Sequence, residues 1–201
     1  PGIECEAEEV IRKLSAYTGR FIGVNLEPVG NSSLLSERSA LPAGRMATVE
    51  NAEKVKKLGF DYIVLTGNPG TGVDNTAIIK ALQEMRAVVG DDLILMAGKM
   101  HAAGSKTEAG CNIINKEQIH AFISAGADVI LLPAPGTVPG ITFEFISEMI
   151  AYVHSLGKLT LTAIGTSQEG ASAATIEQIA LMCKMAGTDL HHIGDAAIGG
   201  M

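Results

Sequence analysis

Short apolar runs recur along the chain, and each is followed by a Gly-, Pro- or Thr-rich loop and then by a segment with helical periodicity. The runs occupy residues 21–26, 62–66, 93–97, 129–132, 159–164 and 190–193. They follow one another at intervals of about 30 to 40 residues, which is the length of a strand–helix unit. The pattern therefore predicts six β-strands that alternate with helices.

The segments between the runs are predicted to be helices. Residues 78–85 place four apolar side chains on one helical face, as residues 146–153 do again later in the chain. Asn115 with Gln118 has the spacing of a capping box, and Thr48 is expected to cap the helix that follows it. Each unit is then expected to end on a glycine in a left-handed conformation: Gly19, Gly59, Gly90, Gly126, Gly157 and Gly187.

Strands that are apolar on both faces indicate a parallel sheet covered by helices. Even spacing and the absence of a Rossmann fingerprint favour a (β/α)₈ TIM barrel over an open doubly wound sheet. No linker interrupts the pattern, so we expect a single domain over residues 1–201. Six units fall short of eight, and about two N-terminal βα units and the last helix are expected to lie outside this sequence.

Composition narrows the class of protein. Hydrophobic residues make up 47% and charged residues 18%, and the net charge is −7, which argues against a nucleic-acid partner. No apolar run approaches the length of a membrane span, and the acidic residues among the first nine lead us to expect no signal peptide. Cys5, Cys111 and Cys183 are widely separated and odd in number, so we expect no disulfide and a cytoplasmic location.

Two residues that follow the third strand are candidates for catalysis. Lys99 comes two residues past the apolar run, where a barrel side chain can pair with an anionic substrate or, once desolvated, form a Schiff base. His101 can serve as an acid or base because the ordinary pKa of histidine lies near neutrality. The alternatives are a rim lysine and a solvent-exposed histidine.

Carboxylates at the ends of other strands are further candidates. Glu27 and Asp195 can exchange protons with a substrate or hold Mg²⁺ through water, and Mg²⁺ is accordingly a possible cofactor. Asn25 lies two residues before Glu27 in the same strand and is a candidate for substrate binding. The long loop 28–47 is predicted to act as a lid, with Arg38 and Arg45 able to close on an anion, and the alternative is a solvated loop whose charges have no special role.

Glycine-rich loops indicate an anion-binding rim. Small and hydroxyl residues in the last two strand–helix loops are typical of a barrel phosphate site, and the loop 66–72 can present further backbone N–H groups. The alternative is glycine used only for tight turns or close packing. The candidate residues for anion and substrate binding in these loops are Asn68, Gly165, Thr166, Ser167, Gly194, Gly199 and Gly200.

Several of these segments together resemble a known group. They comprise residues 23–28, 66–72, 98–101, 165–170 and 194–195. The chain is similar over nearly its whole length to uncharacterised bacterial (β/α)₈ proteins, some labelled haloacid-dehalogenase-like hydrolases and others phosphoenolpyruvate-mutase-like. The resemblance implies the barrel and an additional N-terminal part, but no particular reaction.

The sequence thus favours an enzyme, a lyase or isomerase that acts on a small phosphorylated or carboxylated metabolite. A phosphohydrolase is an alternative, as some of the labels suggest. A non-catalytic sensor that binds a phosphorylated metabolite is a second alternative. The expected partner is a small anionic molecule, with no nucleic acid and no membrane, and barrels of this kind often form homo-oligomers.

Overall fold

The computed structural model describes residues 9–30, 41–67, 71–101, 106–165 and 170–194. Six strands form one parallel sheet in which each strand pairs with the next along the chain. They are β1 (Gly23–Leu26), β2 (Tyr62–Leu65), β3 (Ile94–Gly98), β4 (Val129–Pro133), β5 (Leu159–Ile164) and β6 (Leu190–Ile193). All six predicted strands are confirmed, with ends that differ by at most two residues.

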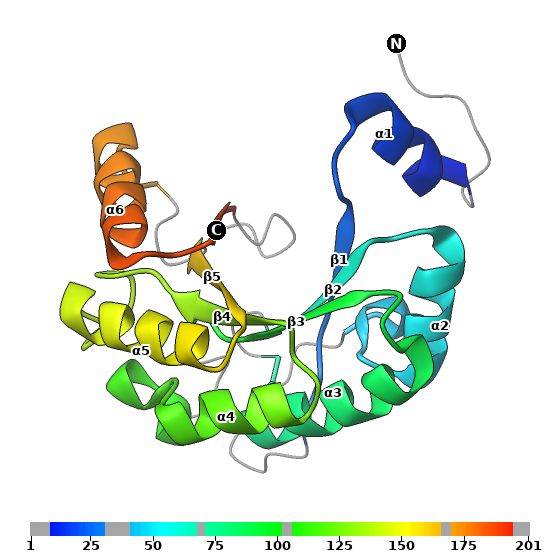
Figure 1. Cartoon of the computed structure of the whole chain (residues 1–201), viewed down its shortest axis with the longest axis horizontal. Helices are drawn as coiled ribbons and strands as arrows, with labels where there is room; N and C mark the ends of the chain where they lie inside the picture. The colour runs from blue at the N-terminus through cyan, green and yellow to red at the C-terminus, as the bar shows by residue number, and fades with distance from the viewer. Residues whose placement is uncertain (1–8, 31–40, 68–70, 102–105, 166–169, 195–201) are drawn as a thin grey trace.

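Helices follow the strands and lie along one side of the sheet. They are α1 (Val10–Thr18), α2 (Val49–Leu58), α3 (Asn75–Val89), α4 (Lys116–Ser124), α5 (Phe143–Ser155) and α6 (Ala173–Ala186). The sheet curls, α2 to α5 form an arc around its convex side, and α1 and α6 stand at the two ends of the arc (Figure 1). The architecture is therefore a curled parallel half-barrel, which agrees with the predicted barrel type.

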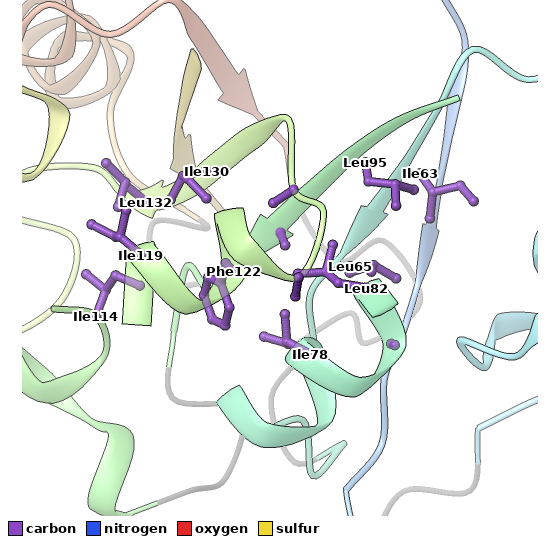
Figure 2. Close-up of a cluster of buried hydrophobic side chains, with 14 of the residues drawn as sticks. Ile63, Leu65, Ile78, Leu82, Leu95, Ile114, Ile119, Phe122, Ile130 and Leu132 are labelled. Atoms are coloured by element: carbon purple, nitrogen blue, oxygen red, sulfur yellow. The ribbon is translucent and has the colours of Figure 1, made fainter. Parts of the chain in front are cut away.

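The main core lies between the sheet and the helices. Alternate strand residues such as Ile63, Leu65 and Leu95 face the helices and meet Ile78 and Phe122 there (Figure 2). A smaller cluster, which includes Met96, Val129, Leu131, Leu161 and Ala163, occupies the other face of the sheet. Both faces are apolar, as the strand composition predicted.

Helix ends follow the capping signals in the sequence. The Thr48 side chain accepts a hydrogen bond from the N–H of Asn51 at 3.2 Å, and Asn115 accepts one from Gln118 at 2.9 Å. The glycines that end the six units all have positive φ. Gly19, Gly59 and Gly187 are left-handed as predicted, whereas Gly90 has a ψ of −136° and lies outside the left-handed helical region. A residue with a β-carbon is strained in that conformation, which is why glycine recurs there.

One junction recurs at the N-terminal ends of the strands. The carboxylate of Asp61 accepts a hydrogen bond from the N–H of Ile22, which belongs to the neighbouring strand segment, at 2.7 Å. Asp128 binds the N–H of Leu95 in the same way at 3.0 Å, and Asp189 binds that of Thr160 at 2.7 Å. The repeated Gly-X-Asp sequence therefore links adjacent strands at the end of the sheet opposite the expected site.

Two further expectations concern the environment of the protein. None of the helices in the described ranges is long and apolar enough to cross a membrane. Cys111 is exposed and Cys183 is buried, both as free thiols, and Cys5 lies outside the described residues. The cytoplasmic location stays a prediction.

Candidate functional site

The predicted site residues that the structure describes lie at or near the C-terminal ends of the strands. Asn25 and Glu27 are at the end of β1, Lys99 and His101 follow β3, and Gly165 and Gly194 follow β5 and β6. Parallel strands bring these ends to one edge of the sheet, where barrel chemistry is located. Six predicted site residues lie outside the described part of the chain: Asn68, Thr166, Ser167, Asp195, Gly199 and Gly200.

Lys99 is almost completely buried, with 2% of the residue exposed. Its Nζ forms an ion pair and hydrogen bond with the carboxylate of Glu108, the last residue of the 3₁₀ turn η3 (Lys106–Glu108). Both Glu108 oxygens also accept from the backbone N–H of Asn75, the first residue of α3, at 3.3 and 3.1 Å. An internal carboxylate thus occupies the N-terminal end of α3, where the free backbone N–H groups of a helix favour an anion.

The position of Lys99 depends on the residue before it. Gly98 ends β3 with φ of 151°, a conformation that strains a residue with a β-carbon. A β-carbon there would also collide with the backbone carbonyl of Leu131 in β4. Glycine at this position therefore lets β3 pack closely on β4 as the chain turns toward Lys99.

Glu27 forms a second charged centre. Its side chain is fully buried and forms an ion pair with Arg45, at the end of the 3₁₀ turn η2 (Ala43–Arg45) that precedes α2. The backbone supports the same contact, since the Glu27 N–H donates to the Arg45 carbonyl at 2.8 Å and the Ala47 N–H donates to the Glu27 carbonyl at 3.0 Å. Arg45 thus binds a carboxylate of the protein itself, and Arg38 lies outside the described residues.

His101 connects the two centres electrostatically. Burial lowers the pKa of its imidazole, the Glu27 carboxylate opposes that shift, and the Lys99 ammonium reinforces it. The pKa of Lys99 is also lowered by burial, against the opposing effects of the Glu108 and Asp74 carboxylates. Desolvation, which disfavours charge on either group, is thus the main cause in both cases.

Four buried polar atoms at this edge of the sheet, on the side chains of three residues, make no hydrogen bond with any described residue. They are the Oδ1 of Asn25, the Oγ1 of Thr66 after β2, and both amide atoms of Asn75. A buried polar group without a partner destabilises the fold, and such groups often serve a ligand. Asn25 was a predicted site residue, whereas Thr66 and Asn75 appeared in the sequence only as parts of a loop and a helix start.

Gly165 and Gly194 both lie where the backbone is closely approached. A β-carbon on Gly165 would lie 2.5 Å from the sulfur of Met100, and one on Gly194 would lie 2.8 Å from the His192 ring. The Gly194 N–H donates to the Ile164 carbonyl at 3.2 Å. Close packing thus accounts for glycine at both positions, and an anion-binding role for them stays a prediction.

The described ranges contain no group of three or more His, Cys, Asp or Glu residues arranged to hold a metal ion. Glu27 is engaged by Arg45, and Asp195, its predicted partner for Mg²⁺, is outside those ranges. The Mg²⁺ site stays a prediction.

Sequence reasoning missed Glu108, the partner of the key lysine. It lies nine residues beyond Lys99 in a segment that shows neither helical nor strand periodicity. Only the path of the chain brings it to the start of α3. Arg45 was singled out as a cation of the long loop, and its partner Glu27 as a strand-end carboxylate, but nothing in their sequence spacing indicates that the two side chains meet.

Comparison with solved structures supports the fold. The chain is similar to a deoxyribose phosphate aldolase from Aeropyrum pernix, described as a unique tetramer, with a TM-score of 0.59 and 13% identity over 94% of this chain and 72% of that one. It is also similar to a putative deoxyribose-phosphate aldolase from Toxoplasma gondii ME49, with a TM-score of 0.53 and 14% identity over 93% and 70% of the two chains. At this identity the likeness shows the fold alone.

Sequence comparison gives a family. A family model described as a domain of unknown function, DUF7916, matches residues 1–201. No curated protein matches the chain. Neither the hydrolase label nor the mutase label of the resemblance noted above gains support from these comparisons.

Proposed function

This chain belongs to the DUF7916 family, and we propose that it is a lyase or isomerase that acts on a small phosphorylated or carboxylated metabolite. The observation that carries the proposal is Lys99, an almost fully buried lysine at the C-terminal edge of a barrel-type sheet, with Glu108 as its ion-pair partner. Exposed lysines are common, whereas burial of a lysine lowers its pKa and makes the neutral, nucleophilic amine more accessible, even though the Glu108 carboxylate opposes that shift.

The chemistry follows from the lysine. A neutral Lys99 amine adds to a substrate carbonyl and forms an iminium, which withdraws electrons from the adjacent carbon bonds. Cleavage of one of those bonds gives a lyase, and movement of a proton gives an isomerase. One structural neighbour is a deoxyribose phosphate aldolase and another is a putative one, and an aldolase is a lyase acting on a carbonyl compound, so the fold is compatible with this chemistry.

Other residues complete the proposed site. His101 and Glu27 exchange protons with the substrate, because they are linked electrostatically beside Lys99. Asp195 has the same role or holds Mg²⁺ with Glu27. The substrate anion is bound by Asn25, by Asn68 and by the two late loops, with residues 165–167 in one and Gly194, Gly199 and Gly200 in the other.

Covalent trapping tests the proposal directly. The protein is incubated with sodium borohydride and one carbonyl compound at a time: pyruvate, dihydroxyacetone phosphate, glyceraldehyde 3-phosphate or deoxyribose 5-phosphate. Borohydride reduces an iminium to a stable secondary amine, and peptide mass spectrometry locates it. We expect one of these compounds to label Lys99 and to leave the 75%-exposed side chain of Lys80 unlabelled at the same concentration.

Lys99→Met and Lys80→Met are the matched variants. We expect Lys99→Met to lose trapping and turnover and Lys80→Met to keep both. Turnover that survives in Lys99→Met would reject the lysine mechanism. If a chelator abolishes turnover by the wild-type protein, the result would indicate the metal-dependent alternative.

The proposal includes completion of the barrel by further βα units. Among the described residues β1 and β6 each pair with a single neighbouring strand. Large apolar side chains are exposed at these two ends of the sheet. This chain aligns with 72% and 70% of the lengths of the two aldolases, so each of them has further residues beyond the aligned part. The exposed side chains at the ends are Tyr17, Phe21, Leu181, Met185, Leu190 and Ile193.

A further inference from the structure

The Lys99 ammonium is held by a carboxylate that is itself fixed at two points. Glu108 binds the Lys99 Nζ on one side and the N–H of Asn75, at the start of α3, on the other. Its side chain is 18% exposed and that of Lys99 is 1% exposed, so solvent contributes little to either charge. Glu108 is therefore the main group that compensates the buried ammonium.

The other charges near Lys99 are fewer and less direct. Asp74, the N-cap of α3, favours the ammonium through space but uses its own Oδ1 to accept from the N–H of Ala77 at 2.8 Å. His101, two residues along the chain, interacts with Lys99 when it is charged. Lys99 Nζ donates a hydrogen bond to Glu108, which places this carboxylate to receive the proton.

We propose that Glu108 controls the proton on Lys99: it holds the ammonium in the resting site, accepts one proton when the amine attacks, and returns that proton as water leaves. This inference rests on the proposed function, because it assigns a role within the same site. Glu108 is thus a positioning and proton-transfer residue of the lysine, and the backbone of α3 keeps its carboxyl group in place throughout.

The step balances without another reactant. One proton moves from Lys99 Nζ to a Glu108 oxygen, and the free electron pair on nitrogen forms a bond to the substrate carbonyl carbon while the C=O π pair moves to oxygen. A second proton moves from nitrogen to that oxygen, which gives a carbinolamine. The hydroxyl then leaves with the proton from Glu108 as water, and the nitrogen pair closes the C=N bond, so one iminium cation faces one Glu108 carboxylate.

Reductive methylation measures the state of Lys99 without any substrate. Formaldehyde with dimethylamine–borane methylates only neutral amines, and peptide mass spectrometry gives the rate at Lys99 as a function of pH. Glu108→Gln keeps the shape of the side chain but removes the charge that favours the ammonium. We expect this variant to be methylated at Lys99 about tenfold faster than the wild type at pH 7, with the pH profile moved to lower pH.

A control and a replacement variant make the result decisive. Glu117→Gln changes an exposed carboxylate in the first turn of α4 and is expected to leave the Lys99 profile unchanged. Should Glu108→Gln fail to fold by circular dichroism, Glu108→Asp draws the charge back by one methylene and is expected to move the profile in the same direction by less. A Lys99 profile that stays in place, or moves to higher pH, overturns the inference.

The trapping experiment then separates the two proposals. With a carbonyl compound that labels Lys99, we expect Glu108→Gln to form the trapped adduct at least about tenfold more slowly, although its amine is more often neutral. A merely structural role would lower both rates together. If no carbonyl compound labels Lys99 in the wild type, the proposed function fails, whereas the methylation profile still decides whether Glu108 controls the proton.

Discussion

The middle of the sheet and its two ends differ in how completely the chain buries its apolar surface. Over β2 to β4 the helix-facing side chains are inaccessible, with Ile63, Leu95 and Ile130 all at 0% exposure. At the ends, Phe21 before β1 and Ile193 in β6 are 78% and 62% exposed. The end strands carry more polar residues than the middle ones, but their large apolar side chains are exposed chiefly because each end strand has a single neighbouring strand in the described sheet. Strand pattern therefore specifies a parallel sheet but not where the sheet stops.

The largest expected effect contrasts two phenylalanines. Phe122 in α4 is fully buried in the main core, and Phe122→Ala is expected to lower the free energy of unfolding by about 3–5 kcal/mol because it leaves a cavity. Phe21→Ala removes the same side chain at the exposed end and is expected to change it by less than about 0.5 kcal/mol. Urea unfolding followed by circular dichroism measures both, and equal losses would show that the two regions do not differ as described.

An arginine in each region gives the next contrast. Arg86 donates to the carbonyls of Gly126, at 2.7 Å from Nη2, and Leu93, at 3.2 Å, and forms an ion pair with Asp128. Arg86→Met is expected to lower the free energy of unfolding by about 2–3 kcal/mol because these partly buried acceptors lose their donors.

Its counterpart is Arg12 in α1, which donates to the Lys57 carbonyl at 3.1 Å on the surface. Arg12→Met is expected to lower the free energy of unfolding by less than about 1 kcal/mol. The same urea titration applies. A loss for Arg12→Met as large as that for Arg86→Met would mean that α1 is held as firmly as the middle of the sheet.

The dependence of stability on acid pH is a smaller effect, which we compare at two of the repeated junctions, Asp128 in the middle of the sheet and Asp189 at its end. Burial raises the pKa of Asp128, but the Leu95 N–H, Arg86 and Lys158 together bring it below the ordinary value. A carboxyl whose pKa is lowered by folding contributes stability that is present above the unfolded pKa and is lost as pH falls through the folded one. Stability is therefore expected to fall as the pH drops below about 4, and Asp128→Asn to weaken that dependence.

The pKa of Asp189, at the β6 end of the sheet, is shifted in the same direction as that of Asp128. Burial raises its pKa, and hydrogen bonds from His154 and Thr160 lower it below the ordinary value overall. Because Asp128 is 36% exposed, solvent screens its ion pairs, and we expect each change in acid dependence to be about 1 kcal/mol or less. Unfolding free energies of the two asparagine variants measured between pH 3 and 7 test this, and an unchanged slope in Asp128→Asn would contradict it.

The fold was predictable because its signals are local. Apolar runs and capping residues such as Thr48 and Asn115 each follow from a few neighbouring residues, and the structure places them as expected. The gathering of the described candidate residues at one edge was predictable as well, since the C-terminal ends of parallel strands share that edge. Lys99 and Glu27 could be selected from their positions alone.

The partners in the site were not predictable in the same way. Glu108 reaches Lys99 through an irregular segment, and Arg45 reaches Glu27 from the loop before α2, so neither pair has a sequence spacing that signals contact. Whether a lysine is buried likewise depends on all the residues that pack around it, and these come from distant parts of the sequence. Charge pairing across loops depends on tertiary path, which periodicity does not encode.

The smallest expected effect is at an exposed leucine, and its size depends on what surrounds the half-barrel. Leu181 in α6 is 56% exposed, and Leu181→Ala is expected to lower the free energy of unfolding of this chain by less than about 0.5 kcal/mol. In a longer polypeptide with all eight βα units, a following helix would cover this face. In that longer polypeptide Leu181→Ala is expected to lower the free energy of unfolding by about 2 kcal/mol or more, because the side chain becomes buried. Urea unfolding of the variant in both polypeptides measures the difference, with Leu82→Ala as a control whose effect is large in each since Leu82 is already inaccessible. An equally small effect in both would mean that the α6 face stays open to solvent, and that the exposed ends of the sheet are surfaces of the finished protein.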